Sequence, residues 1–155
     1  MFGIVSYMQE RFNPYAAALA LLIKNDSILL LRRADTNWAN GLYTLPSGHI
    51  DEGESAIDAC IREAKEEVGI VIDRNSISLA HVLHRRNKEN SKVFVDFILL
   101  CTSWDGEPIN NEPHKCDDVR WFKLDSLPDN MIPFVRVAIE NYQRGVYFSA
   151  PGWNE

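Results

Sequence analysis

Acidic side chains are concentrated in one short segment, between Gly48 and Gly69. The 155-residue chain contains 16 Lys or Arg and 22 Asp or Glu residues, which gives a net charge of −6. That segment carries −5 of this charge, from seven acids against two bases. Both a cation-binding site and a solvated helix face fit such a segment.

Three of the acids, Glu63, Glu66 and Glu67, are spaced at i, i+3 and i+4, so they share one face if the segment is helical. A salt-bridged solvated face would carry Lys or Arg four residues after each Glu, but those positions hold a glutamate, an isoleucine and a valine. Only Arg62 is spaced to pair with an acid, Glu66. A hard divalent cation such as Mg²⁺ or Mn²⁺ would offset the repulsion, so the pattern favours a metal site.

The elements that must position these acids begin with an amphipathic helix over Ser55–Val68. Its apolar stripe is formed by side chains that recur at i, i+4, i+7 and i+11, namely Ile57, Ile61, Ala64 and Val68. Ser55 with Asp58 is a capping-box pattern, and Gly69 stands where a left-handed C-cap belongs. The three glutamates lie roughly opposite the stripe.

The segment from Gly48 to Ile70 resembles a complete Nudix box, G-x5-E-x7-R-E-U-x-E-E-x-G-U, in which U is aliphatic. The resemblance implies hydrolysis of a nucleoside diphosphate linked to another moiety, with a divalent metal. Glu63, Glu66, Glu67 and the Gly48 carbonyl would hold Mg²⁺ or Mn²⁺, and Arg62 and Glu54 would orient these ligands. It also implies a Nudix-type α/β/α sandwich with a mixed central sheet and a catalytic loop-helix-loop.

The remaining patterns predict an α+β domain. Strands are expected where apolar runs end at turn residues: Tyr15–Leu22, Ser27–Arg32, Ile77–Leu83, Lys92–Cys101 and Val119–Leu124. A closing helix is expected over Ile132–Tyr142. We expect an N-terminal extension over residues 1–13, the domain over residues 14–145 and a C-terminal tail over residues 146–155.

A further carboxylate, Glu112, lies in a loop before the last predicted strand. Several Nudix enzymes place an extra carboxylate there for metal binding or general-base catalysis, so the resemblance makes Glu112 a candidate. A solvated loop acid is the alternative, and Glu107 competes for the same role.

Substrate contacts are expected from basic and aromatic residues near the box. Arg32 and Arg33 end one strand, and since successive side chains alternate, at most one faces the site. His49 is next to Gly48 and is either a site residue or an exposed loop histidine. The aromatic side chains Trp38, Tyr43, Phe94, Trp104 and Trp121 are mostly core candidates, of which one at most would stack on a base. The segment from His84 to Arg86 is expected to be a solvated hairpin end, with a phosphate contact as the minor alternative.

The composition limits the binding partners and the cellular compartment that can be expected. A net negative charge disfavours binding to DNA duplexes or to anionic membranes. The longest apolar run, Tyr15–Ile23, is too short to span a bilayer as a helix. Three cysteines without C-x-x-C spacing favour a reducing compartment, and we expect a cytoplasmic protein, monomeric or homodimeric.

The expected substrate is a nucleoside triphosphate or a related nucleotide that carries a diphosphate. The same residues could instead cleave a nucleotide sugar, a dinucleotide or a capped RNA end. An alternative of another class is a catalytically silent nucleotide sensor with the same fold. Such a sensor usually lacks some of the box carboxylates, whereas this chain has all of them.

Overall fold

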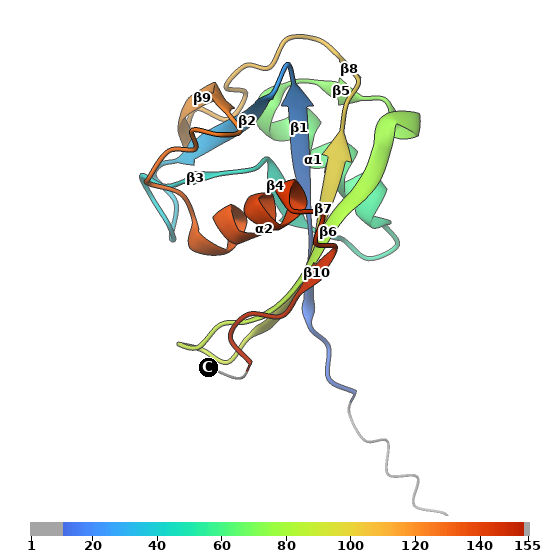
Figure 1. The fold of residues 1–155 in the computed structure, drawn as a ribbon, viewed down its shortest axis with the longest axis vertical. Helices are drawn as coiled ribbons and strands as arrows, with labels where there is room; N and C mark the ends of the chain where they lie inside the picture. Colours follow the sequence, from blue (N-terminus) through green and yellow to red (C-terminus); the bar gives the residue numbers. More distant parts are fainter. Residues whose placement is uncertain (1–10, 154–155) are drawn as a thin grey trace, which may run out of the picture.

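The computed structural model describes residues 11–153, which form an α+β fold with two helices and a mixed sheet (Figure 1). The predicted strands and both helices are confirmed, with shifts of a few residues at their ends. In chain order the elements are β1 (Tyr15–Lys24), β2 (Ser27–Arg33), β3 (Tyr43–Thr44), β4 (Ser47–His49), α1 (Ala56–Val68), β5 (Val71–Ile72), the 3-10 helix η1 (Arg74–Ser76), β6 (Ile77–Arg86), β7 (Val93–Cys101), β8 (Trp104–Asp105), β9 (Cys116–Lys123), α2 (Pro133–Gln143) and β10 (Phe148–Ser149).

Strand β1 is the centre of the sheet. It pairs in parallel with β7 along Tyr15–Leu22, and on its other side it pairs antiparallel first with β4 and then, at its end, with β2. The strand order is β10-β6-β7-β1-β2-β3, with β9 on β2. Strand β10 joins β6, so part of the segment expected to be a C-terminal tail belongs to the sheet. Residues 1–10 of the expected N-terminal extension lie outside the described residues.

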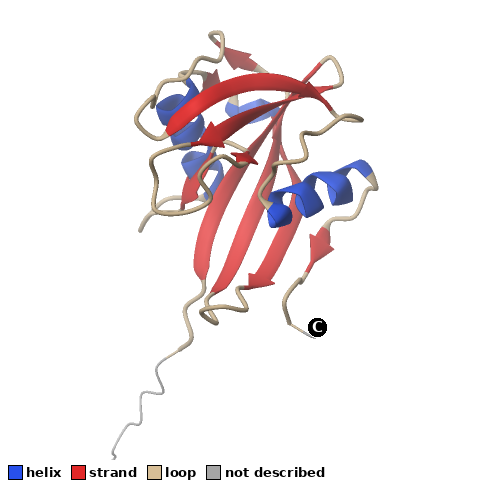
Figure 2. Cartoon of the chain, turned by 90° about the vertical axis from the view of Figure 1, so that its left-hand side faces the viewer, coloured by secondary structure: helices blue, strands red, loops and turns tan. Residues whose placement is uncertain are grey.

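The apolar run in β1 is buried on both faces. Ala18, Ala20 and Leu22 belong to the core under α1, whereas Leu19 and Leu21 belong to the core under α2. The two helices therefore cover opposite faces of the sheet, and the three layers are visible in Figure 2. Burial on both faces explains why this strand reads as a continuous hydrophobic run. Within residues 11–153, no helix is both long and apolar enough to span a membrane.

Helix α1 begins and ends as its sequence predicts. The Ser55 side chain accepts from the Asp58 N–H, the Asp58 side chain accepts from the Ser55 N–H, and Gly69 adopts a φ of 71° at the C-cap. The buried side of the helix includes Cys60, whose Sγ lies 3.7 Å from that of Cys101 in β7. These contacts fix the helix against the sheet. The face that carries the glutamates is directed toward β4 and the neighbouring loops.

Candidate active site

Two of the three box carboxylates contact strand β4. The Ser47 N–H donates to Glu67 Oε2 over 2.7 Å. The Glu63 carboxylate occupies the space that a Cβ at position 48 would need, so only glycine fits at Gly48 without displacing it. Glu66 differs, because its side chain is 53% exposed. The backbone of a three-residue strand thus holds Glu63 and Glu67 side by side, one helical turn apart.

Arg62 links the helix to the loop before it. Its guanidinium binds Glu54 through Nε–Oε1 at 2.8 Å and Nη2–Oε2 at 2.9 Å, and Nη2 also donates to the His49 carbonyl at 3.0 Å. Spacing alone predicted an Arg62–Glu66 pair, which is present at 3.5 Å, but Nη1 also contacts Glu63. Arg62 thus contacts two of the three box carboxylates, Glu63 and Glu66.

The electrostatics of the carboxylates differ strongly. The bidentate Arg62 contact, together with the Asp51 N–H, lowers the pKa of Glu54 to about 2. Burial raises the pKa of Glu67 to about 8, and the Glu63 carboxylate adds to this effect, against the opposing Ser47 hydrogen bond. Burial also raises the pKa of Glu63, although Arg62 opposes it. The inner carboxylates are thus costly to ionise without an added cation.

The loop after β8 docks on the C-terminal end of α1. The Ile109 N–H donates to the Val68 carbonyl at 3.1 Å, and the Asn111 N–H donates to the Glu67 carbonyl at 3.1 Å. Asn111 Nδ2 donates to the Glu66 carbonyl at 2.9 Å. These bonds satisfy carbonyls that every helix leaves without partners at its end. The loop is therefore fixed to the turn of the helix that carries the glutamates.

Glu112 follows directly in this loop and shares a small cavity of about 50 Å³ with Glu67 and Arg33. Its carboxylate raises the pKa of Glu67, and it is paired with Lys115 Nζ at 2.7 Å. The structure thus brings Glu112 to the box carboxylates. Glu107 lines neither this cavity nor the larger pocket and is exposed, so the two loop acids are distinguished by position.

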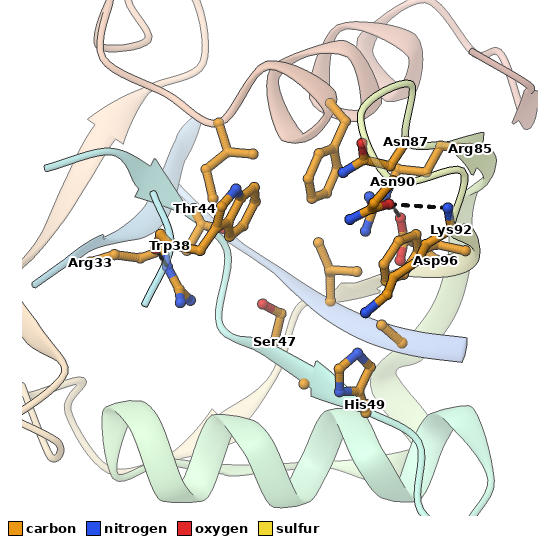
Figure 3. Close-up of a pocket in the computed structure, with 16 residues that line it drawn as sticks. Arg33, Trp38, Thr44, Ser47, His49, Arg85, Asn87, Asn90, Lys92 and Asp96 are labelled. Carbon is orange, nitrogen blue, oxygen red and sulfur yellow. Dashed lines mark hydrogen bonds and ion pairs between the residues drawn. The ribbon is translucent and has the colours of Figure 1, made fainter. Parts of the chain in front are cut away.

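A pocket of about 430 Å³ lies on the other side of β4 (Figure 3). The three residues of β4 line it, and Figure 3 shows Ser47 and His49 above α1, with α2 on the opposite side. The lining residues are Ala17, Leu19, Arg33, Trp38, Thr44, Ser47, Gly48, His49, Arg85, Asn87, Asn90, Lys92, Phe94, Asp96, Ile132 and Phe134. A volume of this size with aromatic walls and a few polar groups is typical of a small-molecule site.

Three residues expected to contact substrate, Arg33, Trp38 and His49, line this pocket. Arg33 also lines the Glu67 cavity and therefore lies between the two spaces. Its guanidinium is held by the Trp38 carbonyl through Nε at 3.0 Å. The Trp38 ring is 54% exposed, so part of its surface is open to a ligand.

Arg32 and Tyr43 were also expected to contact substrate, but neither lines the pocket or the Glu67 cavity. They are partners across β2 and β3. Arg32 Nε binds Asp117 at 2.7 Å, and Tyr43 is only 4% exposed, with its hydroxyl on Asp118. The alternation of side chains along β2 sends Arg33 to the pocket and Arg32 to the opposite face.

Two further charged residues, Arg85 and Asp96, line the pocket (Figure 3), and sequence reasoning did not single out Asp96. Arg85 was expected at a solvated hairpin end, but its side chain is 16% exposed, and it binds the buried Asp96. The register pairs Arg85 with Phe94 and Leu83 with Asp96, which places both charged side chains on one face. One signal was present in the sequence: Asp96 interrupts an apolar strand, and a buried carboxylate needs a partner.

Comparison with known proteins agrees with this geometry. The NUDIX domain family model matches residues 13–142. The chain is 27% identical to an ADP-ribose pyrophosphatase of Methanocaldococcus jannaschii, over 85% of this chain and 75% of the relative. It is 26% identical to an NAD-capped RNA hydrolase, NudC, of Shigella dysenteriae, over 84% of this chain but only 48% of the relative. The chain thus spans about half the length of that relative.

A solved structure shows the same arrangement of elements. The crystal structure of a MutT NUDIX hydrolase from Burkholderia pseudomallei superposes with a TM-score of 0.76 and 30% identity, covering 83% of this chain and 98% of that chain. The family model covers most of the present chain, including the helix that carries Glu63 and Glu67. This chain therefore belongs to the Nudix family and is a Nudix hydrolase.

Proposed function

We propose that the protein hydrolyses the diphosphate linkage of a nucleoside triphosphate or a related nucleotide. One observation carries this proposal: Glu63 and Glu67 converge on β4, whose other side is a wall of the 430 Å³ pocket. A nucleotide in that pocket would extend its phosphates past Gly48 toward the carboxylates. Arg33, between the pocket and the Glu67 cavity, is placed to contact a phosphate.

The proposed cofactor is Mg²⁺ or Mn²⁺, held by Glu63, Glu66, Glu67 and the Gly48 carbonyl. Two observations fit a hard cation: the donors are all oxygens, and glycine at position 48 leaves the backbone open beside Glu63. Within residues 11–153, no three His, Cys, Asp or Glu side chains are already gathered in ligating positions. Arg62 contacts Glu63 and Glu66 instead, so their carboxylates would have to turn from Arg62 to bind. When bound, the cation would neutralise phosphate oxygens and lower the pKa of water.

The chain itself would supply orientation and a proton acceptor. Arg62 binds Glu54 and the His49 carbonyl, and so it fixes the position of the loop before α1 relative to the glutamates of the helix. Glu112 and Glu67 share one cavity, so either carboxylate can accept the proton of the attacking water. Lys115 Nζ lies 2.7 Å from Glu112 Oε1 and holds that carboxylate in the loop.

Two relatives favour a second candidate substrate class. One is named an ADP-ribose pyrophosphatase and the other an NAD-capped RNA hydrolase. Both names describe a diphosphate that joins two nucleoside or sugar halves. The same catalytic residues would cleave such a linkage, with one half in the pocket and the other outside it.

The three cysteines are free thiols, which supports the proposed cytoplasmic location.

A product analysis tests the proposal. The purified protein is incubated with Mg²⁺ and, separately, with nucleoside triphosphates, ADP-ribose, NAD⁺ and nucleotide sugars, and the phosphorylated products are identified. We expect cleavage between two phosphorus atoms of at least one compound, and no cleavage in excess chelator. Nucleotide binding without turnover across the whole panel would instead identify a catalytically silent sensor.

A further inference from the structure

The Arg85 guanidinium is enclosed on both of its flat faces. Its Cζ lies 3.9 Å from the ring centroid of Phe94 and 3.9 Å from that of Phe134. Its Nε donates to Asp96 Oδ2 at 2.5 Å. Asp96 is only 1% exposed, so the pair is held inside the wall of the pocket. Stacking and the ion pair together fix the plane in which the guanidinium lies.

The outer edge of this guanidinium is available to a ligand. Within residues 11–153, the bond to Asp96 is the only hydrogen bond that the guanidinium makes, so Nη1 and Nη2 donate to no described residue. Both faces are covered by rings and Nε is occupied. What Arg85 offers to the pocket is therefore a pair of parallel N–H donors in a fixed plane.

The charge around this edge favours a neutral acceptor pair over another anion. Asp96 balances the charge of Arg85, and its buried carboxylate would repel a phosphate or carboxylate placed beside it. Two other cations, Arg33 and Lys92, also line the pocket and can contact the phosphates; in Figure 3 Arg33 lies across the pocket from Asp96, and Lys92 lies beside Asp96. A planar base that presents two adjacent acceptor atoms suits the Arg85 edge better.

Aromatic rings continue from Arg85 across the pocket. Phe134, which covers one face of Arg85, is nearly parallel to Trp38, with 6.2 Å between ring centroids and 13° between planes. Figure 3 places Trp38 on the side of the pocket opposite Asp96. Since Trp38 is more than half exposed, a flat ligand can stack on it while its edge faces Arg85.

We propose that the pocket selects a 6-oxopurine nucleotide, guanine or hypoxanthine, whose O6 and N7 atoms accept from Nη1 and Nη2 of Arg85. Adenine has an acceptor at N7 but an amino donor at N6, so one N–H group of Arg85 would face another donor instead of an acceptor. Cytosine offers N3 and O2 but less ring area for stacking. Arg85 is thus a specificity residue, and this proposal rests on the proposed function, because it places the base of that substrate.

Ligand binding tests the base without requiring turnover. The full chain in excess EDTA is titrated by calorimetry with GMP, IMP, AMP, CMP, 7-deaza-GMP and ribose 5-phosphate. We expect GMP and IMP to bind at least about 10-fold tighter than AMP, CMP and 7-deaza-GMP, since a bidentate arginine contact discriminates by about this much. Equal binding of GMP and 7-deaza-GMP, or of GMP and ribose 5-phosphate, would overturn the proposal.

Variants connect the preference to Arg85. In Arg85→Gln combined with Asp96→Asn, no unpaired buried charge remains, and we expect GMP and AMP to bind within about 3-fold of each other, because the roughly 10-fold arginine discrimination is lost. Arg86→Gln is the matched control, because Arg86 follows on the same strand but does not line the pocket. Retained guanine preference in the double variant would contradict the assignment of Arg85.

The two proposals fail separately. Selective GMP binding in EDTA, with no hydrolysis of any compound when Mg²⁺ is added, would refute the proposed function and support the base assignment. Hydrolysis at equal kcat/KM for GTP, ATP and 7-deaza-GTP would support the proposed function and refute the base assignment.

Discussion

Glu63 fills the volume into which a side chain at Gly48 would project. Position 48 is therefore restricted by a contact with α1, although Gly48 lies in β4, 15 residues before Glu63 in the chain. The contact ties the backbone of β4 to the carboxylate that we propose as a metal ligand.

Gly48→Ala should lower kcat about 10-fold or more, because the new Cβ must displace the Glu63 carboxylate. Overpacking of this kind costs about 1–3 kcal/mol of the free energy of unfolding, so the fold should survive. Steady-state kinetics and a urea denaturation curve measure the two effects. Thr102→Ala is the control, because Thr102 is exposed and lines neither pocket. Normal kcat in Gly48→Ala would show that the position of Glu63 is not critical.

Glu63→Gln and Glu67→Gln should each lower kcat by about 10²-fold or more while the protein stays folded, because the carboxylates act on developing charge in the transition state. Glu107→Gln is a matched control, since Glu107 is an exposed acid outside both cavities. Turnover is measured on the best substrate of the panel. Near-normal turnover in the two box variants would refute their proposed metal roles.

Glu112→Gln should lower kcat about 10²-fold with little change in KM if Glu112 accepts the proton of the attacking water. Its shared cavity with Glu67 motivates this expectation. The pH profile of kcat separates the alternatives: loss of the acidic limb identifies Glu112 as the base. An unchanged profile and rate would return Glu112 to the role of a loop acid paired with Lys115.

Without metal, Glu67→Gln should stabilise the protein at alkaline pH. The folded pKa of Glu67, about 8, lies above its unfolded value, so the native state loses stability as pH rises from about 4.5 to about 8. Glutamine removes this loss and can still accept from the Ser47 N–H. Relative to the parent, the free energy of unfolding of the variant should increase by about 1–2 kcal/mol between pH 6 and pH 8.5, a value reduced to allow for solvent screening. Urea denaturation in EDTA measures it, and a constant difference would contradict the raised pKa.

Mg²⁺ should reverse the order of stability. A cation bound only by the folded protein stabilises it by about 2.7 kcal/mol at a hundredfold excess over Kd. The parent should therefore gain more than Glu67→Gln, which lacks one proposed ligand. Thermal melts of both proteins at pH 8, with EDTA or with Mg²⁺, give the comparison. Equal upward shifts in the two proteins would mean that Glu67 does not bind the cation.

The sequence by itself determined the local elements and the identity of the catalytic helix. Periodicity, the Ser55 capping box and Gly69 specify α1, because these signals act within a few residues of chain. The spacing of Glu63, Glu66 and Glu67 likewise follows from helix geometry alone. The alternation of Arg32 and Arg33 showed that only one of them could face the site.

Tertiary structure decided which side chains complete the site. Arg33 rather than Arg32 reaches the pocket because of how β2 pairs with β3 and β9. Glu112 rather than Glu107 shares a cavity with Glu67, because Asn111, directly before Glu112, is bonded to the end of α1. Arg85 and Asp96 meet across a hairpin whose register depends on turn geometry and on packing over both faces of the sheet. Such contacts join residues far apart in the chain, and no local spacing rule encodes them.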